Sequence, residues 1–220
     1  MIINKSNYNI AHFIDSQLVT PSAVKNGTHR YNHLKFAMEQ VSITGEVLEF
    51  GVYSGASINM IAEKFLEDIV HGFDSFEGLP EAWAMTKKDI TRGNPRVAKG
   101  HFSVGQLPSV HSNVRLWKGW FNSTLPLYIK EIAPAQIKFL HVDCDLYSST
   151  KTIFDLLNNH IVKETVIVFD EFYPFRDKTE YELWERHEYK ALKEWVERYD
   201  REFTILGRSN YQQCSIKILK

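Results

Sequence analysis

The sequence is organised around one stretch, Glu46 to Ser57, where a short apolar run passes through a glycine-containing turn into a helical pattern. Residues 47–50 have the apolar character of a buried strand, Gly51 and Gly55 follow, and apolar residues recur at helical spacing through 58–65. Such a turn aims backbone N–H groups and a helix N-terminus at whatever lies beyond the strand, which suits an anion or carboxylate. The stretch predicts a strand–turn–helix unit with a ligand site at its turn.

The turn differs from the dinucleotide-binding fingerprint G-x-G-x-x-G. Tyr53 stands where the second glycine would fall and would crowd a pyrophosphate, so a nicotinamide cofactor is disfavoured. Two glycines alone are equally compatible with an ordinary strand-to-helix turn that binds nothing.

The rest of the chain alternates between strand and helix patterns. Further strands are expected at 69–73, 114–117, 137–142 and 165–169, and helices at 29–41, 101–110, 125–132, 148–160 and 181–199. Residues 84–100 are polar and are expected to form a surface loop, and 203–206 with 211–219 read as an antiparallel hairpin. The alternation predicts an α/β fold, with a mostly parallel sheet, helices on both faces and an antiparallel C-terminal hairpin.

Composition narrows the function classes. The net charge of −1 over 220 residues gives no basic field for nucleic acid. No apolar run approaches the roughly 18 residues of a membrane span, so no membrane partner is expected. The two cysteines form no metal-type pair, which favours a reducing, cytoplasmic compartment. Residues 1–28 are expected to be an N-terminal arm or cap, and 29–220 a single domain.

Acidic residues follow several predicted strands. Asp74 ends the second strand, where it could accept hydrogen bonds from two ribose hydroxyls or merely cap a turn. Asp143 and Asp145 follow the fourth strand, and Asp170 and Glu171 the fifth. Because neighbouring strands lie about 5 Å apart, these carboxylates can converge on a hard divalent cation. The alternative is that each caps the helix after it.

Three other sequence features give weaker evidence of a function. His141 lies inside the fourth predicted strand and is interpreted as a core histidine, and Cys144 as a packing residue between two acids. Trp120 and Phe121 could stack on a purine or close the core.

Four motifs together resemble a known family. The first, 47–57, resembles the first motif of class I S-adenosylmethionine-dependent methyltransferases, and within these the metal-dependent O-methyltransferases. Adding 72–80 (GFDSFEGLP), 118–126 (KGWFNSTLP) and 143–150 (DCDLYSST) narrows the resemblance to the macrocin O-methyltransferase (TylF-like) family, which methylates sugar hydroxyls on natural products. The resemblance runs from about residue 31 to the C-terminus and implies a Rossmann-like methyltransferase fold with a seven-stranded sheet.

The resemblance also implies residue roles. S-adenosylmethionine would be bound by residues from the Gly-rich turn, the second strand end, the 118–126 motif and the fourth strand end: Glu49, Gly51, Tyr53, Ser54, Ser57, Asp74, Ser75, Gly119, Trp120 and Asp143. Asp143, Asp170 and Glu171 would hold Mg²⁺ or another divalent cation, and Asp145 would be the general base. The family usually has a second aspartate where this chain has Glu171, which is one methylene longer.

The expected acceptor is a hydroxyl of a sugar or of a glycosylated small molecule. A phenolic or catechol-type acceptor, and a nucleotide-binding protein of similar fold without methyl transfer, are the alternatives. A homo-oligomer is left open, because nothing in the sequence specifies an oligomeric state.

Overall fold

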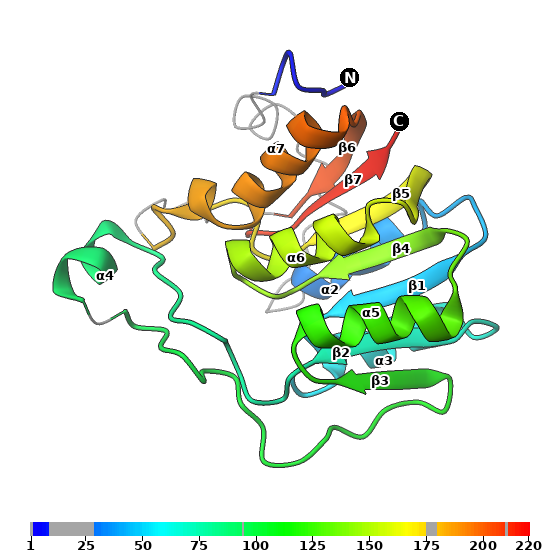
Figure 1. Ribbon diagram of the computed structural model, residues 1–220, viewed down its shortest axis with the longest axis horizontal. Helices are drawn as coiled ribbons and strands as arrows, with labels where there is room; N and C mark the ends of the chain where they lie inside the picture. The colour runs from blue at the N-terminus through cyan, green and yellow to red at the C-terminus, as the bar shows by residue number, and fades with distance from the viewer. Residues whose placement is uncertain (1, 9–28, 94, 175–179, 210) are drawn as a thin grey trace.

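The structure, a computed structural model, describes residues 2–8, 29–93, 95–174, 180–209 and 211–220 (Figure 1). Strands and helices alternate along the chain through most of this length. The elements are α2 (His29–Met38), β1 (Glu46–Phe50), α3 (Ala56–Lys64), β2 (Val70–Asp74), α4 (Lys87–Arg92), β3 (Val114–Lys118), α5 (Phe121–Ile132), β4 (Ile137–Val142), α6 (Tyr147–Leu157), β5 (Ile161–Phe169), the 3₁₀ turn η1 (Trp184–Arg186), α7 (Glu188–Tyr199), β6 (Phe203–Arg208) and β7 (Cys214–Ile218).

The strands form one seven-stranded sheet in the order β3-β2-β1-β4-β5-β7-β6. The first five strands in this order run parallel, while β7 is antiparallel to both β5 and β6. Strand order reverses beside β1, which lies between β2 and β4. In parallel sheets the crevice at such a reversal, beyond the carboxyl ends of the strands, is where ligands bind.

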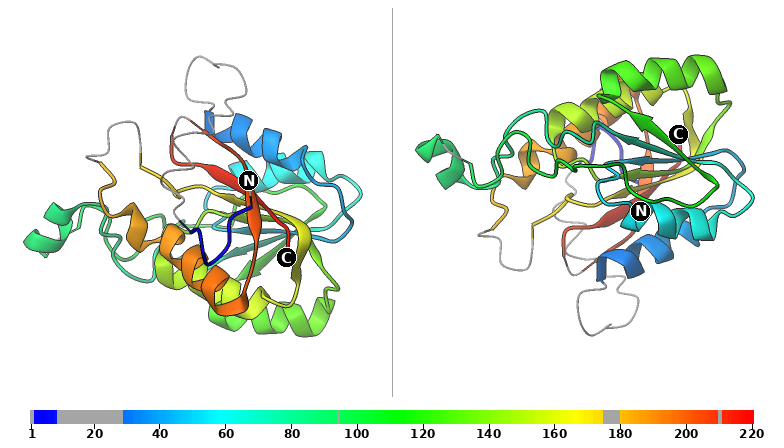
Figure 2. Two further views of the ribbon diagram at one scale, coloured as in Figure 1. Left: turned by 90° about the horizontal axis from the view of Figure 1, so that it is seen from above. Right: turned by 90° about the horizontal axis from the view of Figure 1, so that it is seen from below.

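Helices cover both faces of the sheet, with α2 and α3 on one side and α5, α6 and α7 on the other (Figure 2). Successive side chains of β1 point to opposite faces of the sheet. Val47 packs in the cluster with α2 and α3, whereas Leu48 and Phe50 pack in the cluster with α5, α6 and α7. The strands β1 and β4 therefore bury apolar residues on both faces, interrupted by Glu49 in β1 and by Lys138 and His141 in β4. The predicted fold class is confirmed.

Three local predictions need correction. Residues 101–110 form turns rather than a helix. The expected loop at 84–100 contains the short helix α4, which begins at a capping box in which Thr86 and Asp89 each bond the other's backbone N–H. The helix expected over 181–199 is divided into η1 and α7 at His187, because the buried Glu188 side chain turns inward to accept the Glu171 N–H.

The expected N-terminal arm is described only over residues 2–8. There Ile3 is buried and forms an antiparallel bridge with Phe203 at the edge of the sheet. Most of the arm lies outside the described residues, so its role as a cap remains a prediction. Among the helices that the structure describes, none combines the length and apolar character that a membrane span needs.

Candidate active site

The carboxyl ends of the central strands are held in register at one edge of the sheet. Gly51, Asp143 and Asp170 each donate a backbone N–H to a carbonyl at the end of the neighbouring strand, with N–O distances of 2.9, 2.8 and 3.0 Å. The residue after each strand therefore emerges beside its neighbour. This register places the glycine turn between Asp74 and Asp143.

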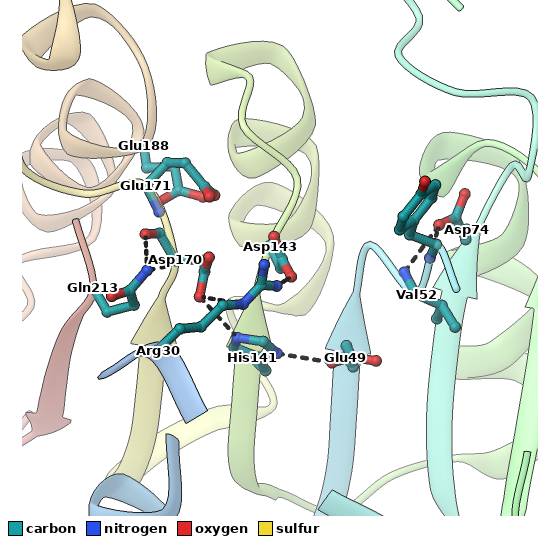
Figure 3. Close-up of polar contacts among 11 residues, drawn as sticks. Arg30, Glu49, Val52, Asp74, His141, Asp143, Asp170, Glu171, Glu188 and Gln213 are labelled. Carbon is teal, nitrogen blue, oxygen red and sulfur yellow. Dashed lines mark hydrogen bonds and ion pairs between the residues drawn. The ribbon is translucent and has the colours of Figure 1, made fainter. Parts of the chain in front are cut away.

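The Asp74 carboxylate organises the turn after β1. Its Oδ2 accepts the backbone N–H groups of Val52 and Tyr53 at 2.9 and 2.8 Å (Figure 3). Its Oδ1 accepts the backbone N–H of Phe76 at 2.7 Å. The position of Asp74 is thus compatible with both interpretations, capping of a turn and binding of ribose hydroxyls. Its carboxylate accepts backbone N–H groups from two turns, and the residue also borders the cavity described next.

A large cavity of about 810 Å³ opens above this edge of the sheet. Most of the residues expected at the site border it, from the glycine turn, the ends of β2, β4 and β5, and the start of α5: Gly51, Tyr53, Asp74, Ser75, Trp120, Asp143, Asp145 and Glu171. Trp120 is 37% exposed, and the partly buried Phe121 both borders the cavity and packs edge-on against Phe50. The cavity lining thus includes both the glycine turn and acids that follow β4 and β5.

Several residues expected at the cofactor lie away from the cavity lining. Glu49 is fully buried in β1, and its Oε1 lies 2.8 Å from His141 Nδ1. Ser57 is buried in the first turn of α3. Ser54, on the turn itself, and Gly119, which precedes Trp120, also lie outside the lining. Their cofactor roles remain predictions.

The acids after β4 and β5 separate into two groups. Asp143 and Asp170 come together with His141, and these three side chains offer ligand atoms that all lie within 4.8 Å of one another. Glu171 turns the other way, toward Glu188, whose Oε2 accepts the Glu171 N–H at 3.2 Å (Figure 3). Among the described residues, the potential metal group therefore contains His141 where the sequence suggested Glu171.

Arg30, on α2, supplies the positive charge for the first group. Its Nη2 contacts Asp143 Oδ2, and its Nε lies 3.2 Å from Asp170 Oδ1. Burial opposes the charge on Arg30, but the carboxylates of Asp143 and Asp170 raise its pKa further above its usual range. Gln213, on the strand connection before β7, donates to Asp170 Oδ2 at 3.3 Å.

His141 is the second group that can carry a positive charge close to Asp143 and Asp170. Burial alone would lower its pKa, but contacts with Asp170 and Glu49 raise it to about 10. Its Nε2 lies 3.8 Å from Asp170 Oδ1, which is too long for a hydrogen bond, and has no other partner. His141 is therefore a buried histidine, as expected, but one that belongs to the acidic group.

Asp145 lies between the two groups of acids. It has a left-handed backbone conformation with φ of 62° and is almost fully buried, yet it borders the cavity. Burial, and then the charge of Asp170, raise the pKa of Asp145 to about 7. Burial together with the neighbouring acids also raises the pKa values of Glu171 and Glu188. A carboxylate with such a pKa can exchange a proton near neutral pH.

Sequence reasoning missed Arg30, Glu188 and Gln213. Arg30 is separated from Asp143 by 113 positions, and no spacing rule connects the two. Glu188 looked like one acid among many on a charged helix, and only its burial distinguishes it. Cys144, by contrast, is a buried free thiol packed in the core, as expected.

This sheet order, with its cavity at the strand-order reversal, is a Rossmann-like architecture with a ligand cavity at the carboxyl ends of its parallel strands. Residues 20–202 match the family model described as Macrocin-O-methyltransferase (TylF). The chain therefore belongs to this family and is an S-adenosylmethionine-dependent O-methyltransferase. No curated protein sequence matches it.

Solved structures share the fold at low sequence identity. The calicheamicin methyltransferase CalS11 is 21% identical with a TM-score of 0.67, and the match covers 95% of this chain and 82% of CalS11. The O-methyltransferase NovP is also 21% identical, with a TM-score of 0.58 and coverage of 88% and 81%. MycE, solved with Mg and SAH, is 15% identical with a TM-score of 0.52, covering 99% of this chain and 55% of MycE.

Proposed function

We propose that this enzyme transfers a methyl group from S-adenosylmethionine to a hydroxyl of a sugar or of a glycosylated small molecule, with help from a divalent cation. The observation that carries the proposal is that Gly51, Asp74, Asp143 and Asp145 border the same cavity. A cofactor held at the glycine turn and an acceptor held at the acids would then meet within one cavity.

The acidic group fits a divalent cation in its donor chemistry. Asp143, Asp170 and His141 provide ligand atoms within 4.8 Å of one another, and His141 Nε2 is buried without a hydrogen-bond partner. The carboxylate oxygens of Asp143 and Asp170 suit Mg²⁺ or Mn²⁺. His141 would join them as a ligand only after losing the proton that its contacts with Asp170 and Glu49 favour. Glu171, the third ligand implied by the family resemblance, has a buried Oε2 without a hydrogen-bond partner.

Side chains that border the cavity would bind the cofactor and accept the proton. Asp74 would bind the ribose hydroxyls and Trp120 would flank the adenine, both from positions on the cavity wall. Asp145 would accept the proton that the acceptor hydroxyl loses as its oxygen attacks the methyl carbon. A bound divalent cation would supply Lewis acidity that lowers the pKa of that hydroxyl.

The names of related proteins support a carbohydrate acceptor. The family is named for a macrocin O-methyltransferase, and one CalS11 structure is described as a TDP-rhamnose 3'-O-methyltransferase. In this chain Arg96 and Lys99, from the 84–100 segment, add two basic side chains to the cavity wall. A sugar nucleotide therefore belongs in the acceptor screen beside neutral glycosides.

The proposal is tested in two stages. Calorimetry with S-adenosylhomocysteine should show binding that Asp74→Ala weakens, while Asp155→Ala, a change of an exposed carboxylate on α6, leaves it unchanged. Methyl transfer is then followed with glycosides, sugar nucleotides and catechols, with and without EDTA. Turnover of catechols alone would contradict the carbohydrate acceptor, and rates unaffected by EDTA would contradict the metal.

A further inference from the structure

Arg30 lies where a cation shared by Asp143 and Asp170 would lie. Its guanidinium contacts Asp143 Oδ2 and, through Nε, comes within 3.2 Å of Asp170 Oδ1 (Figure 3). These two carboxylates are also members of the only potential metal group found among the described residues. The position between them is therefore already filled by a side chain of the protein.

Two close, poorly solvated carboxylates require positive charge nearby. The Asp170 side chain is 3% exposed and that of Asp143 is 16% exposed, so water screens their repulsion poorly. Arg30 stands in the first turn of α2, where the helix dipole disfavours a cation and where no acidic neighbour compensates. Its inward orientation is explained by the two acids across the site.

A guanidinium and a divalent ion cannot share this position. Both would need the same oxygen atoms of Asp143 and Asp170, and their like charges would repel across a few ångströms. Arg30 also borders the cavity and its side chain is 37% exposed, so it has space to leave the acids.

We propose that Arg30 is an internal counter-ion that occupies the divalent-cation position in the metal-free enzyme and leaves it when the cation binds. This inference rests on the metal site in the proposed function. It assigns Arg30 two effects: the guanidinium stabilises the acidic group when no metal is present, and it weakens the affinity for metal by competing for the same carboxylates.

The test measures Mn²⁺ binding directly, by calorimetry and by electron paramagnetic resonance of free Mn²⁺. Arg30→Gln should bind Mn²⁺ about tenfold or more tightly than the wild type, because one competing charge has been removed. Arg115→Gln is the matched control, since Arg115 lies on the edge strand β3 and pairs at 2.7 Å with the exposed Glu131 on α5. Equal or weaker Mn²⁺ binding by Arg30→Gln would overturn the inference.

A second measurement uses the wild type and does not depend on the variant folding. Hydrogen exchange over α2 should become faster when Mg²⁺ is added, because Arg30 loses its contacts with the acids. Unchanged exchange with Mg²⁺ bound would count against displacement. If neither wild type nor Arg30→Gln binds Mn²⁺, the metal part of the proposed function fails and this inference falls with it; if both bind equally, only this inference fails.

Discussion

Replacing Gly51 with alanine tests the close approach on which the site is built. Gly51 has φ of +94°, and a Cβ atom added there would lie 1.7 Å from the backbone oxygen of Asp143. That oxygen belongs to backbone, which cannot rotate away as a flexible side chain could. The turn after β1 and the chain after β4 would have to separate.

The expected loss of stability has two parts. The left-handed conformation costs a residue with a Cβ about 1–2 kcal/mol, and forcing an extra carbon into packed structure costs about 1–3 kcal/mol more. The free energy of unfolding should therefore fall by about 2–5 kcal/mol, a large share of the roughly 5–15 kcal/mol typical of a folded protein.

Gly93→Ala separates the two contributions. Gly93, at the end of α4, also has a positive φ of +63°, but a Cβ there would meet nothing within 4 Å. It should show the conformational cost alone, so Gly51→Ala should be more destabilising by the steric part, about 1–3 kcal/mol. Urea unfolding followed by circular dichroism gives both values, and calorimetry with S-adenosylhomocysteine shows whether Gly51→Ala also weakens cofactor binding.

The reasoning is refuted by two results. One is a loss for Gly51→Ala that equals the loss for Gly93→Ala within about 0.5 kcal/mol, since the contact with Asp143 would then cost nothing. The other is normal affinity for S-adenosylhomocysteine in a destabilised Gly51→Ala protein, which would show that the turn does not contribute to cofactor binding.

Three further predictions concern charged and titratable groups. Asp145→Asn should lower turnover by about 10²- to 10⁴-fold while affinity for S-adenosylhomocysteine is kept; steady-state kinetics that match the wild type would remove its role as base. Asp143→Ala should abolish stimulation of activity by Mg²⁺, and activity titrations that still respond to the ion would show that it binds elsewhere. Burial lowers the pKa of His71 to about 4, and its Nδ1 accepts the indole N–H of Trp117 at 3.1 Å. Because the unfolded chain takes up this proton near pH 6.5 and the folded one does not, the free energy of unfolding should fall by at most about 3 kcal/mol between pH 6.5 and 4. Urea titrations of His71→Asn should show a flatter dependence, and equal slopes would contradict this.

Local patterns predicted most elements because each strand and helix buries its own apolar face. The alternation of strand and helix patterns predicted a mostly parallel sheet, and the nearly continuous apolar run at 165–169 predicted a strand buried on both faces. Prediction failed where a polar interaction, and not apolar periodicity, sets the backbone. The capping box at Thr86 starts α4 inside an expected loop, and the buried Glu188 begins a separate helix where one continuous helix was expected.

Acids at strand ends were predictable for a similar reason. Parallel strands end at one edge, so residues that follow them must gather there, and Asp74, Asp143 and Asp170 do. The direction of each side chain after the strand was not predictable. Glu171 follows Asp170 directly, yet its side chain lies beside that of Glu188 at the start of α7 (Figure 3).

The sequence by itself predicted a ligand site at the ends of the parallel strands, because the glycine turn and the acids lie directly after predicted strands. The class of enzyme followed from the resemblance of four short motifs to a known family. Only the tertiary structure decided which side chains contact the buried acids. Arg30 meets Asp143 and Asp170, and His141 meets Glu49, because the packing of α2 and the register of β4 against β1 bring them together. Charge pairing over such distances along the chain depends on the whole fold, and no local pattern records it.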